Sequence, residues 1–80
     1  MNHLILRTKH NKYRYYAIRC PYKYRMMADK GGYIMYHRLV MAESIGRPLY
    51  KTERVIHKDK NTLNNEIENL KIVRRKQNGK

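Results

Sequence analysis

Residues 53–78 of the chain, ERVIHKDKNTLNNEIENLKIVRRKQN, decide its fold. They place His57, Asn69 and Asn78 in the spacing H-x11-N-x8-N. A strand, a turn and the start of a helix arranged on that spacing would bring the three side chains together around one phosphate. This segment is therefore the first place to look for chemistry.

The segment divides into short elements. Its turn is rich in Asp and Asn, whose side chains hydrogen-bond their own backbone. A short basic helix at its end would add a further positive end for a phosphate. We expect, in order, a strand at Glu53–His57, a turn at residues 59–65, one helical turn at residues 66–69, a second strand at residues 70–73 and a last helix that begins at Arg74.

The segment resembles the HNH endonucleases, also called ββα-metal nucleases, of phage and homing type. It agrees with the family pattern at Glu53, Val55, His57, Asp59, Asn61, Asn64, Asn65, Asn69 and Leu70. Upstream, GYIMYHRLVMAESIGRPL (residues 32–49) is similar to the lead-in of such proteins, so the resemblance covers residues 22–78. It implies an α+β fold, a small single domain in which an N-terminal β-ribbon and a helix lead into a ββα-metal motif with a truncated final helix.

The resemblance also implies roles for individual residues. His57 would be the general base, because a neutral imidazole can deprotonate water near neutral pH. Asn69 would bond across the turn and hold the two strands, since an amide both donates and accepts. Asn78 would bind Mg²⁺ or another divalent cation, which meets the charge that develops on the phosphate oxygens. His37 and Arg38 match the family's H-R, for which we expect a structural or DNA-backbone role.

The segment departs from the family pattern in three places. The family's first metal ligand, an Asp or His, is replaced by Ile56, which cannot bind a cation. The family's turn glycine is replaced by Lys60, so the turn must differ or be strained. The chain stops two residues after Asn78. Asp59 could supply the lost metal ligand from the same face of the strand as His57, although the family pattern makes it a turn former.

The charge of the chain points to nucleic acid as the partner. Nineteen Lys and Arg against six Asp and Glu give a formal net charge of +13, and polyphosphate is the commonest partner of such a balance. The alternatives are a basic surface kept for solubility and an rRNA-binding protein. We expect duplex DNA, contacted by Arg14, Arg19, Lys23, Arg25, Arg38, Arg47, Lys58, Lys60, Arg74, Arg75 and Lys76.

The N-terminal half is expected to form part of that surface. Residues 13–27 alternate basic with aromatic or aliphatic residues, which predicts two short strands broken at Pro21. The tyrosines of this ribbon either stack on the ligand or pack a sheet in a chain without Phe or Trp. Residues 33–45 predict a helix ended by Gly46, and residues 1–12 predict a loose or edge-strand arm.

Eighty residues make one small domain, which we divide into an arm (1–12), a β-ribbon with its helix (13–52) and the ββα motif (53–80). A single Cys excludes an internal disulfide. No apolar run approaches the length of a membrane span or signal peptide, so we expect no membrane partner and a cytoplasmic location. Three functions stay open: a metal-dependent DNA endonuclease or nickase from a phage or mobile element, a degenerate HNH-like module that binds DNA or protein, and a basic RNA-binding protein.

Overall fold

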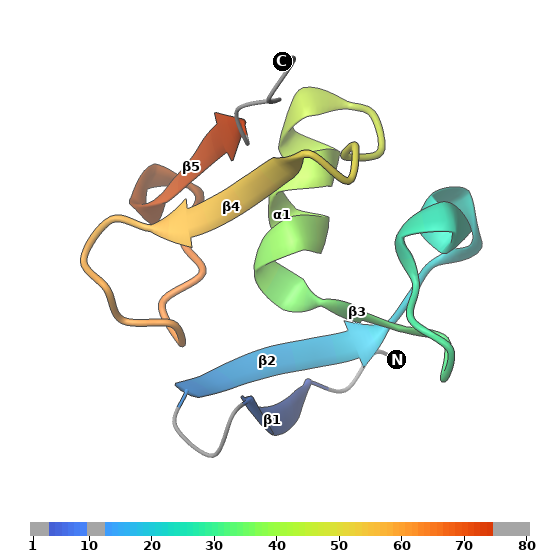
Figure 1. The fold of residues 1–80 in the computed structure, drawn as a ribbon, viewed down its shortest axis with the longest axis horizontal. Coiled ribbons are helices and arrows are strands. Elements are labelled where there is room, and N and C mark those ends of the chain that lie inside the picture. The colour runs from blue at the N-terminus through green and yellow to red at the C-terminus, as the bar shows by residue number, and fades with distance from the viewer. Residues whose placement is uncertain (1–3, 10–12, 75–80) are drawn as a thin grey trace, which may run out of the picture.

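A computed structural model describes residues 4–9 and 13–74 of the protein. These residues form two antiparallel sheets, one α-helix and two short 3-10 helices (Figure 1). In chain order the elements are β1 (Ile5–Lys9), β2 (Tyr13–Arg19), the 3-10 helix η1 (Tyr22–Met27), β3 (Tyr33–Met35), α1 (Tyr36–Ile45), β4 (Glu53–His57), the 3-10 helix η2 (Ile67–Asn69) and β5 (Leu70–Arg74).

The first sheet has the order β1-β2-β3, with β2 in the centre. Its register places Leu6 opposite Tyr16 and Ile18 opposite Ile34. For the described part of the predicted N-terminal arm, Ile5–Lys9, the edge-strand alternative is confirmed, because β1 lies at the edge of the sheet and pairs with β2. Leu6 is exposed, whereas Ile18 and Ile34 are buried, so the core lies beneath the β2–β3 side of this sheet.

The second sheet is the hairpin of β4 and β5, with His57 opposite Leu70. Burial alternates strictly along β4: Glu53, Val55 and His57 face inward, and the residues between them are exposed. This is the period of two that an extended strand imposes on its side chains. The hairpin therefore turns His57 toward the interior of the molecule.

Helix α1 contacts strands of both sheets and joins them around one core (Figure 1). The helix ends at Gly46, whose φ of 78° is the left-handed conformation that was predicted there. The core gathers side chains from every layer: Ile18, Tyr24, Ile34, Leu39, Met41, Ala42, Leu49, Val55 and Leu70.

Two predictions for the N-terminal half are wrong. The helix expected at residues 33–45 begins only at Tyr36, because Tyr33–Met35 pairs with β2 as a strand. The second ribbon strand expected after Pro21 is the 3-10 helix η1, which buries Tyr24 in the core. Alternating sequence cannot separate a strand from a tight helical turn that buries one tyrosine.

The predicted order of the C-terminal half is confirmed, with small shifts of boundary. The helical turn η2 is Ile67–Asn69, and β5 runs on through Arg74. The prediction that Arg74 begins a helix is therefore wrong, and the remainder of that predicted helix lies outside the described residues. Within residues 4–9 and 13–74, no helix has both the length and the apolar character needed to span a membrane.

Candidate functional site

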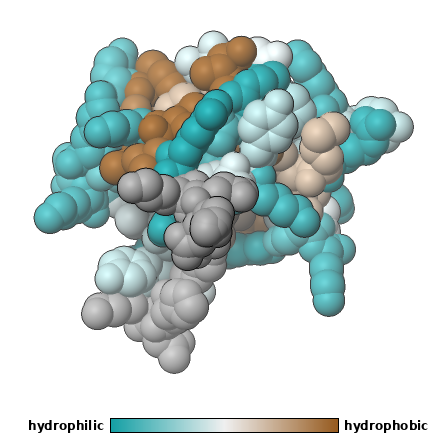
Figure 2. All heavy atoms as spheres, turned by 45° about the horizontal axis from the view of Figure 1, so that its top comes forward, coloured by the Kyte–Doolittle hydropathy of each residue, from teal (hydrophilic) through white to brown (hydrophobic). Residues whose placement is uncertain are grey.

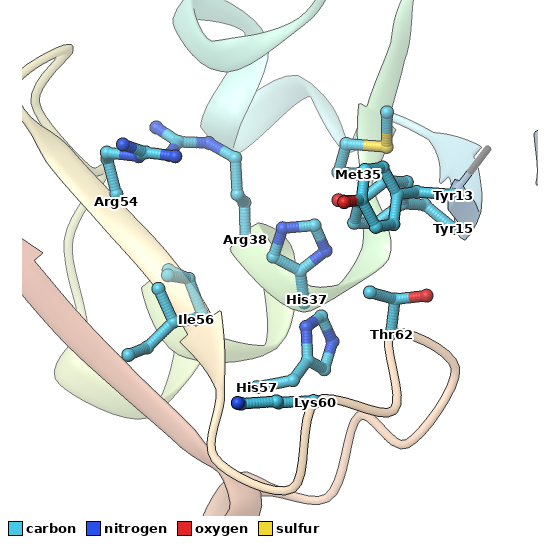
Figure 3. A pocket seen from close by; sticks show the side chains of 11 residues that line it. Tyr13, Tyr15, Met35, His37, Arg38, Arg54, Ile56, His57, Lys60 and Thr62 are labelled. Carbon is cyan, nitrogen blue, oxygen red and sulfur yellow. The ribbon is translucent and has the colours of Figure 1, made fainter. Parts of the chain in front are cut away.

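An open pocket of about 450 Å³ lies where the two sheets face each other. Side chains from β2, β3, α1, β4 and the loop after β4 line it, so no single element forms it (Figure 3). The lining residues are Tyr13, Tyr15, Met35, His37, Arg38, Arg54, Val55, Ile56, His57, Lys60 and Thr62. The predicted base is among them.

His57 is the last residue of β4 and is only 9% exposed. Its Nε2 atom lies 2.8 Å from Oδ1 of Asn65, within hydrogen-bond distance. Its ring centroid is 4.9 Å from that of His37 and 6.5 Å from that of Tyr15. Contacts on several sides thus fix the position of this imidazole.

His37, for which the sequence predicted a structural or DNA-backbone role, was not predicted to lie beside His57. It is buried in the first turn of α1. Its ring centroid lies 5.5 Å from that of Tyr15, and its ring is tilted against the rings of both Tyr15 and His57. Figure 3 shows the two imidazoles side by side in the pocket. The available signal was the H-R pair in the lead-in, but the sequence did not say that α1 would cross beside the end of β4.

Asn69 bonds across the turn in the way that the resemblance implied. Its Oδ1 accepts a hydrogen bond from the backbone N–H of Asp59 at 3.0 Å. Its Nδ2 donates to the carboxylate of Asp59 and to the backbone carbonyl of Asn64, each at 2.9 Å. The backbone N–H of Lys58 in turn donates to the carbonyl of Asn69 at 2.7 Å. One amide therefore connects the end of β4 with the start of β5.

The carboxylate of Asp59 is engaged within this turn. Oδ1 accepts from the backbone N–H of Asn61 at 2.8 Å, and Oδ2 accepts from the side chain of Asn64 at 2.9 Å. The hydrogen bond from Asn64, followed by those from Asn61 and Asn69, lowers the pKa of Asp59 below its ordinary value. Asp59 is thus a carboxylate held by donors of its own loop. Lys60 follows with a φ of 65°, so of the two alternatives predicted from the missing glycine, a different turn or a strained one, the structure has the strained turn.

The described residues do not fit the hard divalent cation that the resemblance implies. No Asp or Glu lines the pocket, and no group of three or more His, Cys, Asp or Glu suited to a metal occurs within residues 4–9 and 13–74. Ile56 lines the pocket, is 40% exposed and offers no donor atom. Mg²⁺ prefers oxygen ligands, carboxylates above all. Asn78, the predicted ligand, lies outside the described part of the chain.

Three cationic side chains give the pocket its electrostatic character. Arg38 and Arg54 extend into the same side of it, and Lys60 lies beside His57 (Figure 3). Arg38 also donates to the backbone carbonyl of Glu53 at 2.9 Å. Partial burial lowers the pKa of Arg38, an effect that the charge of Glu53 opposes. The pocket is therefore suited to an anion.

Arg47 and Arg74 are predicted DNA contacts that the structure places at Glu53. The two terminal guanidinium nitrogens of Arg47 donate to this carboxylate, at 3.0 and 2.8 Å, and Arg74 lies 3.8 Å from it. The backbone N–H of Tyr50 adds a bond of 2.8 Å. The hydrogen bonds from Arg47, then that from Tyr50 and the nearby positive charges, lower the pKa of Glu53 to about 2. Glu53, only 1% exposed, thereby ties the segment after α1 to the hairpin.

The other predicted contacts within the described residues are exposed. The face of the molecule in Figure 2 carries many hydrophilic residues beside a smaller group of hydrophobic ones. Arg14 and Lys58 are exposed near the pocket end of the sheets. Three further predicted contacts are exposed away from the pocket: Arg19 at the other end of β2, and Lys23 and Arg25 on η1. The guanidinium carbon of Arg25 lies 3.9 Å from the ring centroid of Tyr22. Arg75 and Lys76 lie outside the described residues.

A family model described as HNH endonuclease matches residues 35–80, which is more than half of the chain. The match includes His37 and Arg38 as well as the whole hairpin. No curated protein and no solved structure matches the chain.

Proposed function

The chain belongs to the HNH endonuclease family, and from that premise we propose that it hydrolyses phosphodiester bonds in DNA with His57 as the general base. One observation carries the proposal: the motif histidine lies in a pocket beside three cationic side chains. Family membership gives a nucleic acid as the substrate. We further propose that the substrate is duplex DNA, which the resemblance and the charge of +13 support. A phage or mobile-element source, which the resemblance supports, and action in the cytoplasm are part of the same proposal.

The chemistry begins with the phosphate. Its oxygens meet Arg38, Arg54 and Lys60, which neutralise charge that grows as the reaction proceeds. A water molecule attacks phosphorus in line with the leaving 3′ oxygen, while His57 takes the proton of that water. The phosphorus–O3′ bond breaks as the new phosphorus–oxygen bond forms, and the departing 3′ oxygen takes a proton from solvent water to become a hydroxyl. General-base assistance of this kind contributes about 10²- to 10⁴-fold to a rate.

HNH nucleases generally use a divalent metal ion, which supplies positive charge to the scissile phosphate when bound. None of the side chains lining the pocket is a carboxylate, so the pocket itself supplies no ligand for it. Asn78 remains the predicted ligand. Asp59 remains a second prediction, although its oxygens accept hydrogen bonds from Asn61, Asn64 and Asn69.

A second candidate function is a module that binds DNA and does not cut it. Ile56 favours this candidate, because an aliphatic side chain stands where the family has its first metal ligand. The loss of even a supporting group around a metal typically costs about 10- to 100-fold in affinity or activity. Binding through cationic side chains would survive that loss.

Nicking of supercoiled plasmid separates the two candidates, because it detects a single cut. The wild-type protein, His57→Ala and His57→Gln are compared over a titration of Mg²⁺ and Mn²⁺, with DNA binding followed by gel shift and folding by circular dichroism. Nicking that requires His57 and added cation supports the enzyme. Binding without nicking under every condition supports the module. Nicking that survives both His57→Ala and chelation, or failure of the folded protein to bind DNA, overturns the proposal.

A further inference from the structure

The two ring nitrogens of His57 have different surroundings. Nε2 lies 2.8 Å from Oδ1 of Asn65, which is an acceptor and carries no proton. A neutral imidazole bears one proton, on either nitrogen. Only a proton on Nε2 makes this contact a hydrogen bond, and the lone pair is then on Nδ1.

We propose that Asn65 is a positioning residue that holds His57 in the tautomer protonated on Nε2, so that Nδ1 is the atom that accepts the proton of the attacking water. The inference rests on the proposed role of His57 as the base. It adds the basic atom and the residue that selects it. Asn65 does not touch the reacting atoms in this account, because it acts through His57.

The loop around Asn65 is rigid enough for that task. Its neighbour Asn64 donates through Nδ2 to Asp59, receives a bond from Asn69 on its carbonyl, and donates through its backbone N–H to Asn61 at 3.0 Å. These bonds fix the backbone from which the Asn65 side chain extends. The amide oxygen is therefore presented at one place at the end of β4.

The packing of His57 supports the same conclusion from the other side. His37, with its ring centroid at 4.9 Å, and Tyr15, at 6.5 Å, enclose an imidazole that is only 9% exposed. Rotation about the Cβ–Cγ bond, which would exchange the positions of the ring edges, meets these neighbours. The neighbours of the ring therefore maintain the orientation in which Nε2 faces Oδ1 of Asn65.

The opposite arrangement is a clear alternative. If the amide of Asn65 is turned over, its Nδ2 donates to an unprotonated Nε2, and the proton of His57 is on Nδ1. The substitution Asn65→Asp distinguishes the two, because a carboxylate of the same shape accepts and cannot donate. Asn65→Leu removes both possibilities at similar volume.

The experiment is a long-range ¹H–¹⁵N correlation of the histidine side chains at mildly alkaline pH, with His57→Ala assigning the His57 signals. Wild type and Asn65→Asp are expected to show Nε2 protonated, with its proton protected from solvent exchange. Asn65→Leu is expected to lose that protection and to average between tautomers. Asn61→Leu is the matched control: it makes the same change in the same loop, but the side chain of Asn61 bonds the backbone of Leu63 and not His57.

Cleavage provides a second readout. At saturating plasmid, Asn65→Leu is expected to lower the nicking rate by about 10- to 100-fold, with DNA affinity unchanged and the rate recovered in Asn65→Asp. A proton on Nδ1 of the wild type, or an unchanged His57 spectrum in Asn65→Leu, overturns the inference. The spectra do not need cleavage, so a protein with the expected tautomer and no nicking would refute the proposed function while leaving intact the assignment that Asn65 holds His57 protonated on Nε2.

Discussion

The ring centroids of His37 and His57 lie 4.9 Å apart, although the first residue is on α1 and the second ends β4. This contact joins the helix of the lead-in to the hairpin at the pocket itself. The position of the proposed base therefore depends on a residue outside the ββα unit.

We expect the ring of His37 to contribute mainly through packing. His37→Ala removes a buried ring and should lower the free energy of unfolding by about 2 to 3 kcal/mol, with a parallel loss of nicking. His37→Phe keeps a ring against Tyr15 and His57 and should recover most of both. Urea denaturation and plasmid nicking measure the two effects. A Phe variant as damaged as the Ala variant would mean that the nitrogen atoms of His37 are needed.

Ile56→Asp and Ile56→His are expected to raise divalent-cation affinity and to create or increase nicking. The side chain is 40% exposed, so the fold should accept a polar group there. Cleavage rate against Mg²⁺ and Mn²⁺ concentration is the measurement, and Ile67→Asp, an exposed isoleucine on η2, is the control. If wild type cleaves well and both Ile56 variants lose activity, another group already supplies the ligand.

Glu53 should make the fold sensitive to acid. Its pKa is lowered from the ordinary 4.5 to about 2 in the folded state, first by the hydrogen bonds from Arg47. Because the pKa of Glu53 is lower in the folded protein than in the unfolded chain, the ionised carboxylate stabilises the fold at any pH above the unfolded-state pKa. This stabilisation is lost as the pH falls toward the folded-state pKa. At neutral pH, Glu53→Gln should melt about 10 °C or more below wild type.

The acid sensitivity is measured from melting temperatures of both proteins, from neutral pH down to about pH 2. The difference in melting temperature between wild type and Glu53→Gln should be largest above pH 4.5 and should decrease toward pH 2. Asp29 and Asp59, whose pKa values are also lowered, are present in both proteins and leave this difference unaffected. A difference that stays constant with pH would contradict this account of Glu53.

Lys60→Gly is expected to stabilise the protein and weaken its binding to DNA. The φ of 65° costs a side-chain-bearing residue about 1 kcal/mol that glycine does not incur. The same change removes a cation from the pocket. Lys58→Gly, next to the turn but outside the positive-φ residues, should destabilise. Chemical denaturation measures the change in stability, and filter binding measures the change in DNA affinity. If Lys60→Gly is less stable than wild type, the backbone at Lys60 is not strained.

DNA binding should depend strongly on salt. If about six phosphates are neutralised, affinity falls by roughly 10³-fold between about 50 and about 200 mM salt. Arg54→Gln in the pocket and Lys23→Gln on η1 should each reduce the slope by about 1 if both residues contact phosphate. Fluorescence anisotropy with a labelled duplex gives the slopes. Binding that does not change with salt would contradict the phosphate interpretation.

The hairpin was predictable because its signals are local. The Asp and Asn residues of the turn specify their own bonds, and the alternation along β4 fixes which side of the strand is buried. The resemblance also implied the bonding of Asn69 across the turn, which the structure has. The sequence could not predict contacts between segments that lie far apart along the chain. β3 exists because Tyr33–Met35 meets β2, and His37 reaches the pocket because α1 crosses behind β4.

Thr62 and Asn65 attach the loop between β4 and η2 in two directions. The hydroxyl of Thr62 donates to the backbone carbonyl of Arg14 on the first sheet, while the amide of Asn65 lies against His57 on the second. Surface loops normally accept insertions and deletions without harm. Here the contacts of Thr62 and Asn65 hold the loop to different sheets, so the number of residues between these contacts is fixed. The length of the loop therefore sets the distance between the two sheets at the pocket. In a sequence family, such a segment would vary in residue type far more readily than in length.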